Sequence, residues 1–306
     1  MPDPHADAAV EIVDLRVSYG PQTAVDGLSL SVRAGTITAL LGPNGAGKTT
    51  TIEVCEGFRR PGSGQVRVWG LDPQRDGPLL RSRVGVMLQD GGIYSGARAV
   101  PMLRHLSRFY AHPLDVADLA GRLGLDTVRA TYRRMSGGEK QRLALACAIV
   151  GRPDLVFLDE PSAGMDPQTR LAAWALVEQL RSDGATVVLT THLMDEAERL
   201  ADDVAIMDRG RLVAHGTVGE LCGSGESLVF RAEQGLDLAA LRALLPAGST
   251  ADEVAPGRYL VDAGAAGLHA VSTWAASAGV EPRDLSTRRR TLEDVFLDLT
   301  GRELRT

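Results

Sequence analysis

Nine residues at positions 42–50 read GPNGAGKTT, a glycine spacing that ends in lysine and threonine and can hold a triphosphate. The glycines let backbone N–H groups approach phosphate oxygens and take φ angles that other residues resist. Lys48 adds positive charge at the terminal phosphates, and the Thr49 hydroxyl is a hard oxygen that suits Mg²⁺. A chance glycine-rich turn does not account for Lys48, because the chain has only two lysines. The sequence therefore predicts a nucleoside triphosphate site.

Two carboxylates are candidates for the rest of that site. Asp159 and Glu160 come directly after the apolar run 155–158. In a parallel sheet the carboxyl ends of the strands meet at the ligand crevice. We therefore expect Asp159 to face Mg²⁺ near Thr49, and Glu160 to face the attacking water. Carboxylates at a strand end are otherwise often only solvated, so this interpretation depends on the phosphate loop.

A second motif, RMSGGEKQR, occupies residues 134–142. Ser136 and Glu139 have the spacing of a capping box before an apolar helix, and this alone requires no ligand. Gly137 and Gly138 are poor residues for a first helical turn. We interpret them as leaving backbone N–H groups accessible to a bulky anion.

These residues need a framework of alternating strands and helices. The phosphate loop follows the apolar run 36–41 and opens a helix, whose positive end favours an anion. Periodicity predicts further strands and helices along the same region. Strands are expected over 11–19, 28–32, 64–69, 83–88, 155–158, 186–190, 204–207 and 211–214, and helices over 99–110, 114–123, 143–149 and 167–181. This pattern predicts an α/β nucleotide-binding core that extends to about residue 219.

The remaining residues predict a second, smaller domain. Residues 220–226 have the composition of a linker, and residues 227–306 follow it. The order strand, helix, strand, strand, helix, strand is that of a ferredoxin-like α+β domain, and a last helix is expected over 291–299. Residues 1–10 are expected to form a disordered N-terminus.

Bulk composition limits the possible functions. The chain has 306 residues, of which 44% are hydrophobic, enough for a core in each of two domains. A net charge of −6 argues against nucleic acid as a partner. The three cysteines, at 55, 147 and 222, lack metal-ligand spacing and are expected to be buried apolar residues. No signal peptide or run of about 18 apolar residues is evident, so we expect a cytoplasmic protein.

Over residues 11–216 the motifs and their order resemble the ATP-binding subunits of ABC transporters. The phosphate loop corresponds to the family's Walker A motif, and residues 135–139 to its signature, with Met and Glu where Leu and Gln are usual. Residues 155–160 correspond to Walker B with its catalytic glutamate, and 162–166 to the D-loop. The positions that carry the resemblance are Gly42, Pro43, Asn44, Gly45, Ala46, Gly47, Lys48, Thr49, Thr50, Ser136, Gly137, Gly138, Glu139, Asp159, Glu160, Asp166, Gln89, His192 and Tyr19.

This resemblance implies a fold and a set of residue roles. The fold is a P-loop NTPase with a RecA-like core, an antiparallel β-subdomain and a helical subdomain at about 95–150, all within 11–219. Glu160, His192, Lys48 and Gln89 would serve hydrolysis of ATP, and Thr49, Gln89 and Asp159 would bind Mg²⁺. Tyr19 falls where an aromatic ring stacks on adenine.

Partners also follow from the resemblance. ABC domains act as head-to-tail pairs, so Ser136, Gly137, Gly138, Glu139 and Asp166 would contact nucleotide bound by a second ATPase subunit, most simply a second copy. A separate transmembrane permease would hold the pair at the inner face of the cell membrane. Residues 291–301 resemble the end of daunorubicin-resistance-type exporter subunits, which move drugs, lipids or polysaccharides outward.

One departure and several alternatives remain at this point. Residues 97–101 read ARAVP where many relatives have a Thr and Glu pattern, so the identity of the permease does not follow from the resemblance. Import remains an alternative to export. A non-transport ABC ATPase acting on ribosomes or DNA is disfavoured by the single cassette and the acidic charge. A small-molecule kinase is disfavoured by the signature and by His192.

Overall fold

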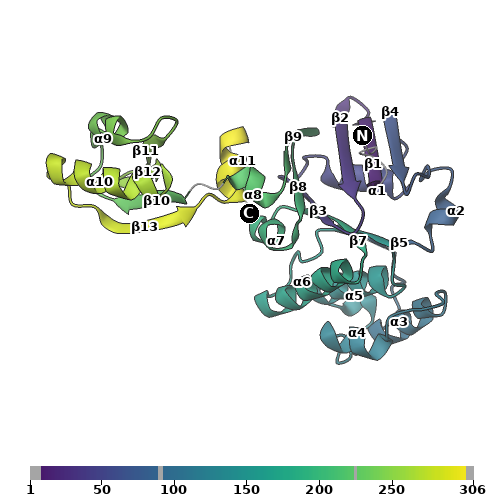
Figure 1. Cartoon of the computed structure of the whole chain (residues 1–306). Coiled ribbons are helices and arrows are strands. Elements are labelled where there is room, and N and C mark those ends of the chain that lie inside the picture. The colour runs from purple at the N-terminus through teal and green to yellow at the C-terminus, as the bar shows by residue number, and fades with distance from the viewer. Residues whose placement is uncertain (1–7, 89–91, 224–225, 301–306) are drawn as a thin grey trace. The chain divides into compact units, whose positions relative to one another are not determined.

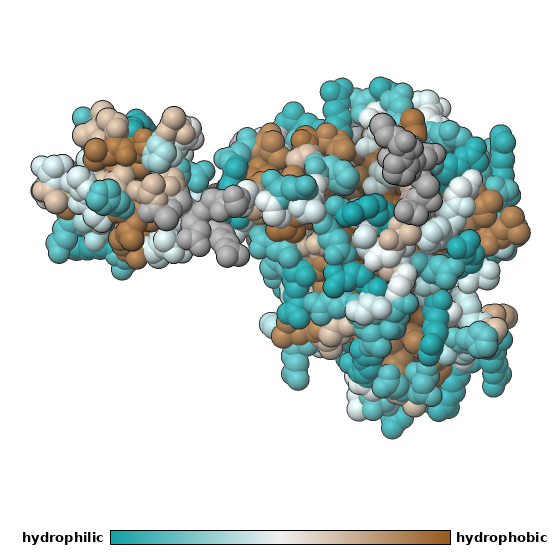
Figure 2. Space-filling model, in the orientation of Figure 1, coloured by the Kyte–Doolittle hydropathy of each residue, from teal (hydrophilic) through white to brown (hydrophobic). Residues whose placement is uncertain are grey.

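The computed structural model describes residues 8–88, 92–223 and 226–300, and divides the chain into two compact units. The first runs to Val218 and the second begins at Gly219. Each is described by itself below. No helix among the described residues is long and apolar enough to cross a bilayer. On the face drawn in Figure 2, apolar residues form separate patches among hydrophilic ones.

A six-stranded sheet forms the centre of the first unit (Figure 1). Its strand order is β5 (Val84–Met87), β6 (Leu155–Asp159), β7 (Thr186–Thr191), β3 (Ile37–Leu41), β8 (Asp203–Asp208) and β9 (Arg211–Gly216). The strands are parallel except for the final β8–β9 pair. Every residue of β3, β6 and β7 is buried, which explains why apolar residues and threonines make up nearly all of these strands. Arg209 and Gly210 both have positive φ in the β8–β9 turn, as a tight hairpin requires.

A smaller antiparallel sheet lies beside the central one. Its order is β2 (Gln22–Arg33), β1 (Ala8–Tyr19) and β4 (Ser63–Val68). Helix α1 (Lys48–Cys55) contacts β2 and β4 of this sheet and β6 of the larger sheet. Ile52 and Val54 of α1 belong to one apolar cluster that includes side chains from both sheets. The helix that opens at the phosphate loop is therefore fixed between the two sheets.

The remaining helices of the first unit cover the central sheet or extend from it. Helix α5 (Gly137–Ile149) contacts β5 and β6, and α6 (Pro167–Ser182) contacts β7. Helix α3 (Ala99–Ser107) contacts both α4 (Val116–Arg122) and α5. Two helices that the sequence did not predict, α2 (Gly77–Leu80) and α7 (Met194–Leu200), complete the unit, with a short 3₁₀ turn at Tyr132–Arg134.

The second unit has the predicted order of elements. Its antiparallel sheet runs β11 (Thr250–Ala255), β12 (Arg258–Asp262), β10 (Glu226–Arg231) and β13 (Arg283–Arg289). Helices α9 (Ala239–Leu244) and α10 (Gly264–Ala278) connect the strands, and α11 (Leu292–Thr300) follows β13. The strand order is that of a ferredoxin-like domain. Its core is aromatic, since Phe230 stacks on Tyr259 with ring centroids 5.2 Å apart and Trp274 lies against Phe230.

The structure corrects two of the expected boundaries. Residues 8–10 do not belong to a disordered N-terminus, because β1 starts at Ala8 and the side chains of Ala9 and Val10 are buried in the core. The expected linker 220–226 is also wrong at both ends. Helix α8 (Val218–Cys222), with Cys222 buried, occupies its first residues, and β10 begins at Glu226.

Close packing of α5 on β5 generates a stability prediction. A Cβ at Gly85 would lie 2.2 Å from the carbonyl oxygen of Ala148, so Gly85→Ala should lower the free energy of unfolding by about 1–3 kcal/mol. Gly121, inside α4, has nothing within 4 Å of a Cβ, and Gly121→Ala should leave stability unchanged or raise it by up to about 1 kcal/mol. Urea unfolding measures both, and equal effects in the two variants would contradict the packing argument.

Candidate active site

The phosphate loop joins β3 to α1 and is held against its neighbours by close backbone contacts. A Cβ at Gly42 would lie 2.3 Å from the carbonyl oxygen of Met207 in β8. A Cβ at Gly47 would lie 2.4 Å from the carbonyl oxygen of Ala24 in β2. Gly47 is also the N-cap of α1 with φ of 99°. Glycine at both positions is therefore required by the neighbouring strands as well as by access to an anion.

Lys48 is buried inside this loop. Its Nζ donates to the carbonyl oxygens of Gly42 at 2.7 Å and Pro43 at 3.0 Å. Burial lowers the pKa of Lys48, and the carboxylates of Glu160 and Asp159 act in the opposite direction. A desolvated ammonium group interacts strongly with an incoming anion, because little water screens it. The side chain is thus suited to bind terminal phosphates.

Asp159 and Thr49 lie together at the carboxyl end of β6. The Thr49 hydroxyl donates to Oδ1 of Asp159 at 3.2 Å, and the Thr190 hydroxyl donates to the same oxygen. Burial raises the pKa of Asp159, whereas these two hydrogen bonds lower it. A hydroxyl and a carboxylate oxygen in contact form a donor set that fits Mg²⁺. No cluster of three or more acidic, histidine or cysteine side chains that could hold a metal occurs among the described residues, so phosphate oxygens would have to complete the set.

Glu160 and His192 form a pair next to Asp159. His192 Nδ1 lies 3.1 Å from Oε1 of Glu160, and both side chains are mostly buried. Glu160 has a φ of 49°, a conformation that costs free energy for a residue other than glycine. Its backbone is held there, since its N–H donates to the hydroxyl of Thr190 at 3.0 Å and its carbonyl accepts from Gln141 Nε2 at 2.6 Å. The strained backbone aims the carboxylate at the imidazole.

The structure shows the capping box at the start of α5. Glu139 N–H donates to the Ser136 hydroxyl at 3.2 Å, and Ser136 N–H donates to Oε2 of Glu139 at 2.8 Å. This accounts for both side chains without a ligand. Ser136 and Gly137 are exposed, and a Cβ at Gly137 would meet open space. The first helical N–H groups of α5 are therefore accessible from outside.

The other predicted site residues have different surroundings. Tyr19 is 44% exposed, and its hydroxyl is hydrogen-bonded to that of Thr50 at 3.2 Å. Asp166 caps α6 by accepting from the N–H and hydroxyl of Thr169, and these bonds lower the pKa of Asp166. Gln89 lies outside the described residues.

Sequence reasoning brought Lys48, Thr49, Asp159, Glu160 and His192 to one site, and the structure places them there. It missed two residues that hold this group, Thr190 and Gln141. Thr190 was identifiable in principle, because it ends the apolar strand next to β6 and is the register partner of Asp159. Gln141 gave no comparable signal, since its contact with Glu160 depends on how α5 packs.

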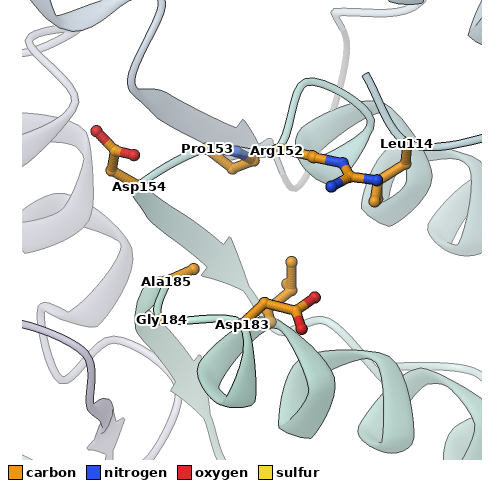
Figure 3. A pocket seen from close by; sticks show the side chains of 8 residues that line it. Leu114, Arg152, Pro153, Asp154, Asp183, Gly184 and Ala185 are labelled. Carbon is orange, nitrogen blue, oxygen red and sulfur yellow. The ribbon is translucent and has the colours of Figure 1, made fainter. Parts of the chain in front are cut away.

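A separate pocket of about 430 Å³ lies at the other edge of the sheet (Figure 3). Residues 152–154 and 183–185 line it, directly before β6 and β7 start, together with Leu114 and Leu180. Since the strands are parallel, this is their amino edge, whereas Asp159 and His192 follow the carboxyl ends. The pocket is therefore no part of the site described above.

Comparisons with known proteins decide the family. Residues 25–163 match a family model described as ABC transporter. A daunorubicin resistance ATP-binding protein of Streptomyces coeruleorubidus is 37% identical over 98% of this chain and 98% of its own length. This chain is an ATP-binding protein of the ABC transporter family. A Nod factor export ATP-binding protein of Ralstonia nicotianae is 36% identical over 97% of this ATP-binding protein and 95% of the relative.

A solved structure supports the same assignment. The ATP-binding subunit of an ABC transporter superimposes with a TM-score of 0.63 and 28% identity, covering 70% of this ATP-binding protein and 91% of the solved chain. The first unit is therefore the predicted ABC ATPase core, with RecA-like, antiparallel and helical parts. The protein binds and hydrolyses ATP.

Two buried threonines, Thr38 in β3 and Thr190 in β7, allow a matched test of the site. Thr190→Val should lower the free energy of unfolding by about 1–3 kcal/mol, because buried Asp159 loses a hydrogen-bond donor. Glu160 N–H loses the hydroxyl but keeps the carbonyl oxygen of Thr190 at 3.2 Å. Thr38 is equally buried, but its hydroxyl has no hydrogen-bond partner among the described residues. Thr38→Val should be neutral or stabilising. Urea titration compares them, and a similar loss in both variants would rule out the hydrogen-bond explanation.

Glu56 makes stability depend on pH. Burial, followed by the carboxylates of Asp159 and Glu53, raises the pKa of Glu56 to about 8. The native protein then keeps a proton that the unfolded chain loses above the ordinary value of 4.5, so the free energy of unfolding falls as pH rises from about 4.5 to about 8. Glu56→Gln removes this dependence. In nucleotide-free protein its Tm should exceed that of the wild type near the upper pH and approach it at the lower one; a pH-independent difference would contradict the argument.

Proposed function

We propose that this protein powers export, hydrolysing ATP at the inner face of the membrane and acting on a separate permease. The observation that carries the proposal is the group of buried charges at the carboxyl edge of the sheet, where Lys48 and Asp159 lie beside the Glu160–His192 pair. Relatives named for drug resistance and for Nod factor export match nearly the whole length of the chain. Their match includes the second unit, which an ATPase core alone would not need.

The phosphate loop supplies most of the binding. Lys48 would exchange the carbonyl oxygens of Gly42 and Pro43 for oxygens of the terminal phosphates. The first N–H groups of α1, at the positive end of the helix, would face the same phosphates. Phosphoryl transfer depends mainly on positioning and on neutralising charge. A phosphate loop followed by a helix that is fixed between two sheets is suited to both.

Glu160 and His192 act on the water and on the terminal phosphate. Glu160 would orient the attacking water and accept its proton, a contribution of roughly 10²–10⁴ in rate. His192 holds the Glu160 carboxylate through Nδ1, which leaves Nε2 free to face the γ-phosphate. Gln89 would sense the metal and relay occupancy to the partner.

Magnesium fits the donor set at the end of β6. Thr49 and Asp159 would hold it together with Gln89, and Mg²⁺ would neutralise charge on the phosphates. The raised pKa of Asp159 supports this role, because a nearby cation favours the ionised carboxylate that burial disfavours.

A second ATPase subunit would complete the site. The chain carries one phosphate loop and one signature motif. The hydrogen bonds of Ser136 lie within the first turn of its own helix. Gly137 is exposed and Gly138 is partly exposed beside it. Ser136, Gly137, Gly138 and Glu139, with Asp166 nearby in sequence, would therefore contact nucleotide held by the other subunit, most simply another copy.

The direction of transport is inferred from relatives that are named for daunorubicin resistance and for Nod factor export. One name states export and drug resistance fits it, so export is favoured over import. The net charge of −6 gives no support to a role on ribosomes or DNA.

A trapped dimer tests the proposal. In Glu160→Gln the base is lost while the phosphate loop and signature remain, so Mg-ATP should hold two chains together and turnover should fall by at least about 100-fold. Light scattering after gel filtration with and without Mg-ATP measures the mass. The double variant Glu160→Gln with Lys48→Ala is the control and should stay monomeric. A Glu160→Gln protein that binds Mg-ATP yet remains a monomer at every concentration would refute the shared site.

A further inference from the structure

Arg59 lies against the ring of Tyr19, the side chain that the family resemblance places on the adenine base of the nucleotide. It follows α1 in the chain, forty positions after Tyr19. Its guanidinium carbon is 4.4 Å from the centroid of the Tyr19 ring, within the range of a cation–π contact. An arginine that stacks on a ring covers one of its two faces.

Arg59 is fixed in this position from two directions. Its Nε donates to Oε2 of Glu53, on α1, at 2.5 Å. The hydrogen bond to Glu53 raises the pKa of Arg59, so its charge is secure. On the other side Gln74 Nε2 donates to the carbonyl oxygens of Gly57 and Arg59, both at 2.8 Å. Hydrogen bonds to its side chain and to its backbone therefore hold Arg59 in place over Tyr19.

The Tyr19 ring is held at its edge as well. Its hydroxyl is hydrogen-bonded to Thr50, two residues after the phosphate-loop lysine, at 3.2 Å. With these two contacts made, Tyr19 is still 44% exposed, which leaves surface for a base. The contact with Thr50 ties Tyr19 to the helix that begins at the triphosphate site. A base stacked there would extend from phosphates held by Lys48.

We propose that Arg59 is a positioning residue for the purine base of the nucleotide, acting through Tyr19. This inference rests on the proposed role of Tyr19. A cation on one face of the ring draws electron density away from the other, which improves stacking on an electron-rich purine. The contacts of Arg59 and Thr50 also fix the orientation of the Tyr19 ring before the nucleotide binds, so less conformational entropy is lost on binding. Glu53 and Gln74 support the arrangement by holding Arg59.

Equilibrium binding to the full chain tests the idea with two probes, Mg-ATP and Mg-tripolyphosphate. Arg59→Ala should weaken ATP binding about 2- to 5-fold and leave tripolyphosphate, which has no base, unchanged. Arg60 is the matched control, because it is the neighbouring arginine and is exposed. Arg60→Ala should alter neither affinity. Thermal unfolding of each variant checks that the fold is retained.

A double-variant cycle separates this inference from the proposed function. If Arg59 acts through Tyr19, then Arg59→Ala should have no further effect on ATP affinity in a Tyr19→Ala background. In the Arg59→Ala single variant, KM for ATP should rise while kcat is unchanged. Tighter ATP binding in Arg59→Ala would mean that the guanidinium occupies the face meant for the base, and would overturn the inference. So would an unchanged ATP affinity, or an equal loss with tripolyphosphate. If Tyr19→Ala leaves ATP affinity unchanged, the proposed role of Tyr19 itself fails.

Discussion

The parallel register of three buried strands is the constraint on which this protein depends. Pairing of β3 with β7 and of β7 with β6 aligns the ends of the strands, so that Leu41 lies opposite Thr191 and Asp159 opposite Thr190. The phosphate loop and the two carboxylates therefore meet at one edge of the sheet. A shift of one residue would turn every side chain of a strand to the opposite face of the sheet, so the alignment is strongly specified where these strands are packed.

That alignment brings charges of opposite sign into a nearly dry environment. Burial shifts the pKa of Lys48 down and the pKa values of Asp159 and Glu56 up, so each charged form is destabilised by lack of water. A triphosphate with its cation would complement these groups on both sides. A bound nucleotide with its cation would therefore relieve part of this desolvation.

Backbone geometry serves the same purpose. Gly42 and Gly47 have no room for a side chain, and Glu160 is held at a positive φ by Thr190 and Gln141. Such positions persist only where surrounding hydrogen bonds and packing fix them. Helix α5 differs, because its capping box satisfies Ser136 and Glu139 within the chain, whereas Gly137 between them is exposed. The hydrogen bonds of this motif are thus satisfied without a ligand, although its proposed role in ATP hydrolysis would require a second subunit.

Local sequence determined much of this protein. The phosphate loop, the capping box and the carboxylates after an apolar strand are short patterns whose function depends on neighbouring residues, so the sequence alone predicted Lys48, Asp159 and Glu160. The order of elements in the second unit was also predictable, since turn residues and periodicity separate each element from the next. The failures were at boundaries, such as residues 8–10, where Ala9 and Val10 are buried by strands far along the chain.

Only the tertiary structure decided the contacts between distant segments. The contacts of Arg59 with Tyr19 and of Gln141 with Glu160 join different elements, and no short pattern encodes them. The raised pKa of Glu56, at the end of α1, is likewise invisible in the sequence, because it arises mainly from burial and from the carboxylate of Asp159 on β6. Sequence determines which chemical groups are available and how each segment folds locally; packing of the sheets on α1 decides which of those groups share a site, because distance and water exclusion are properties of the folded chain.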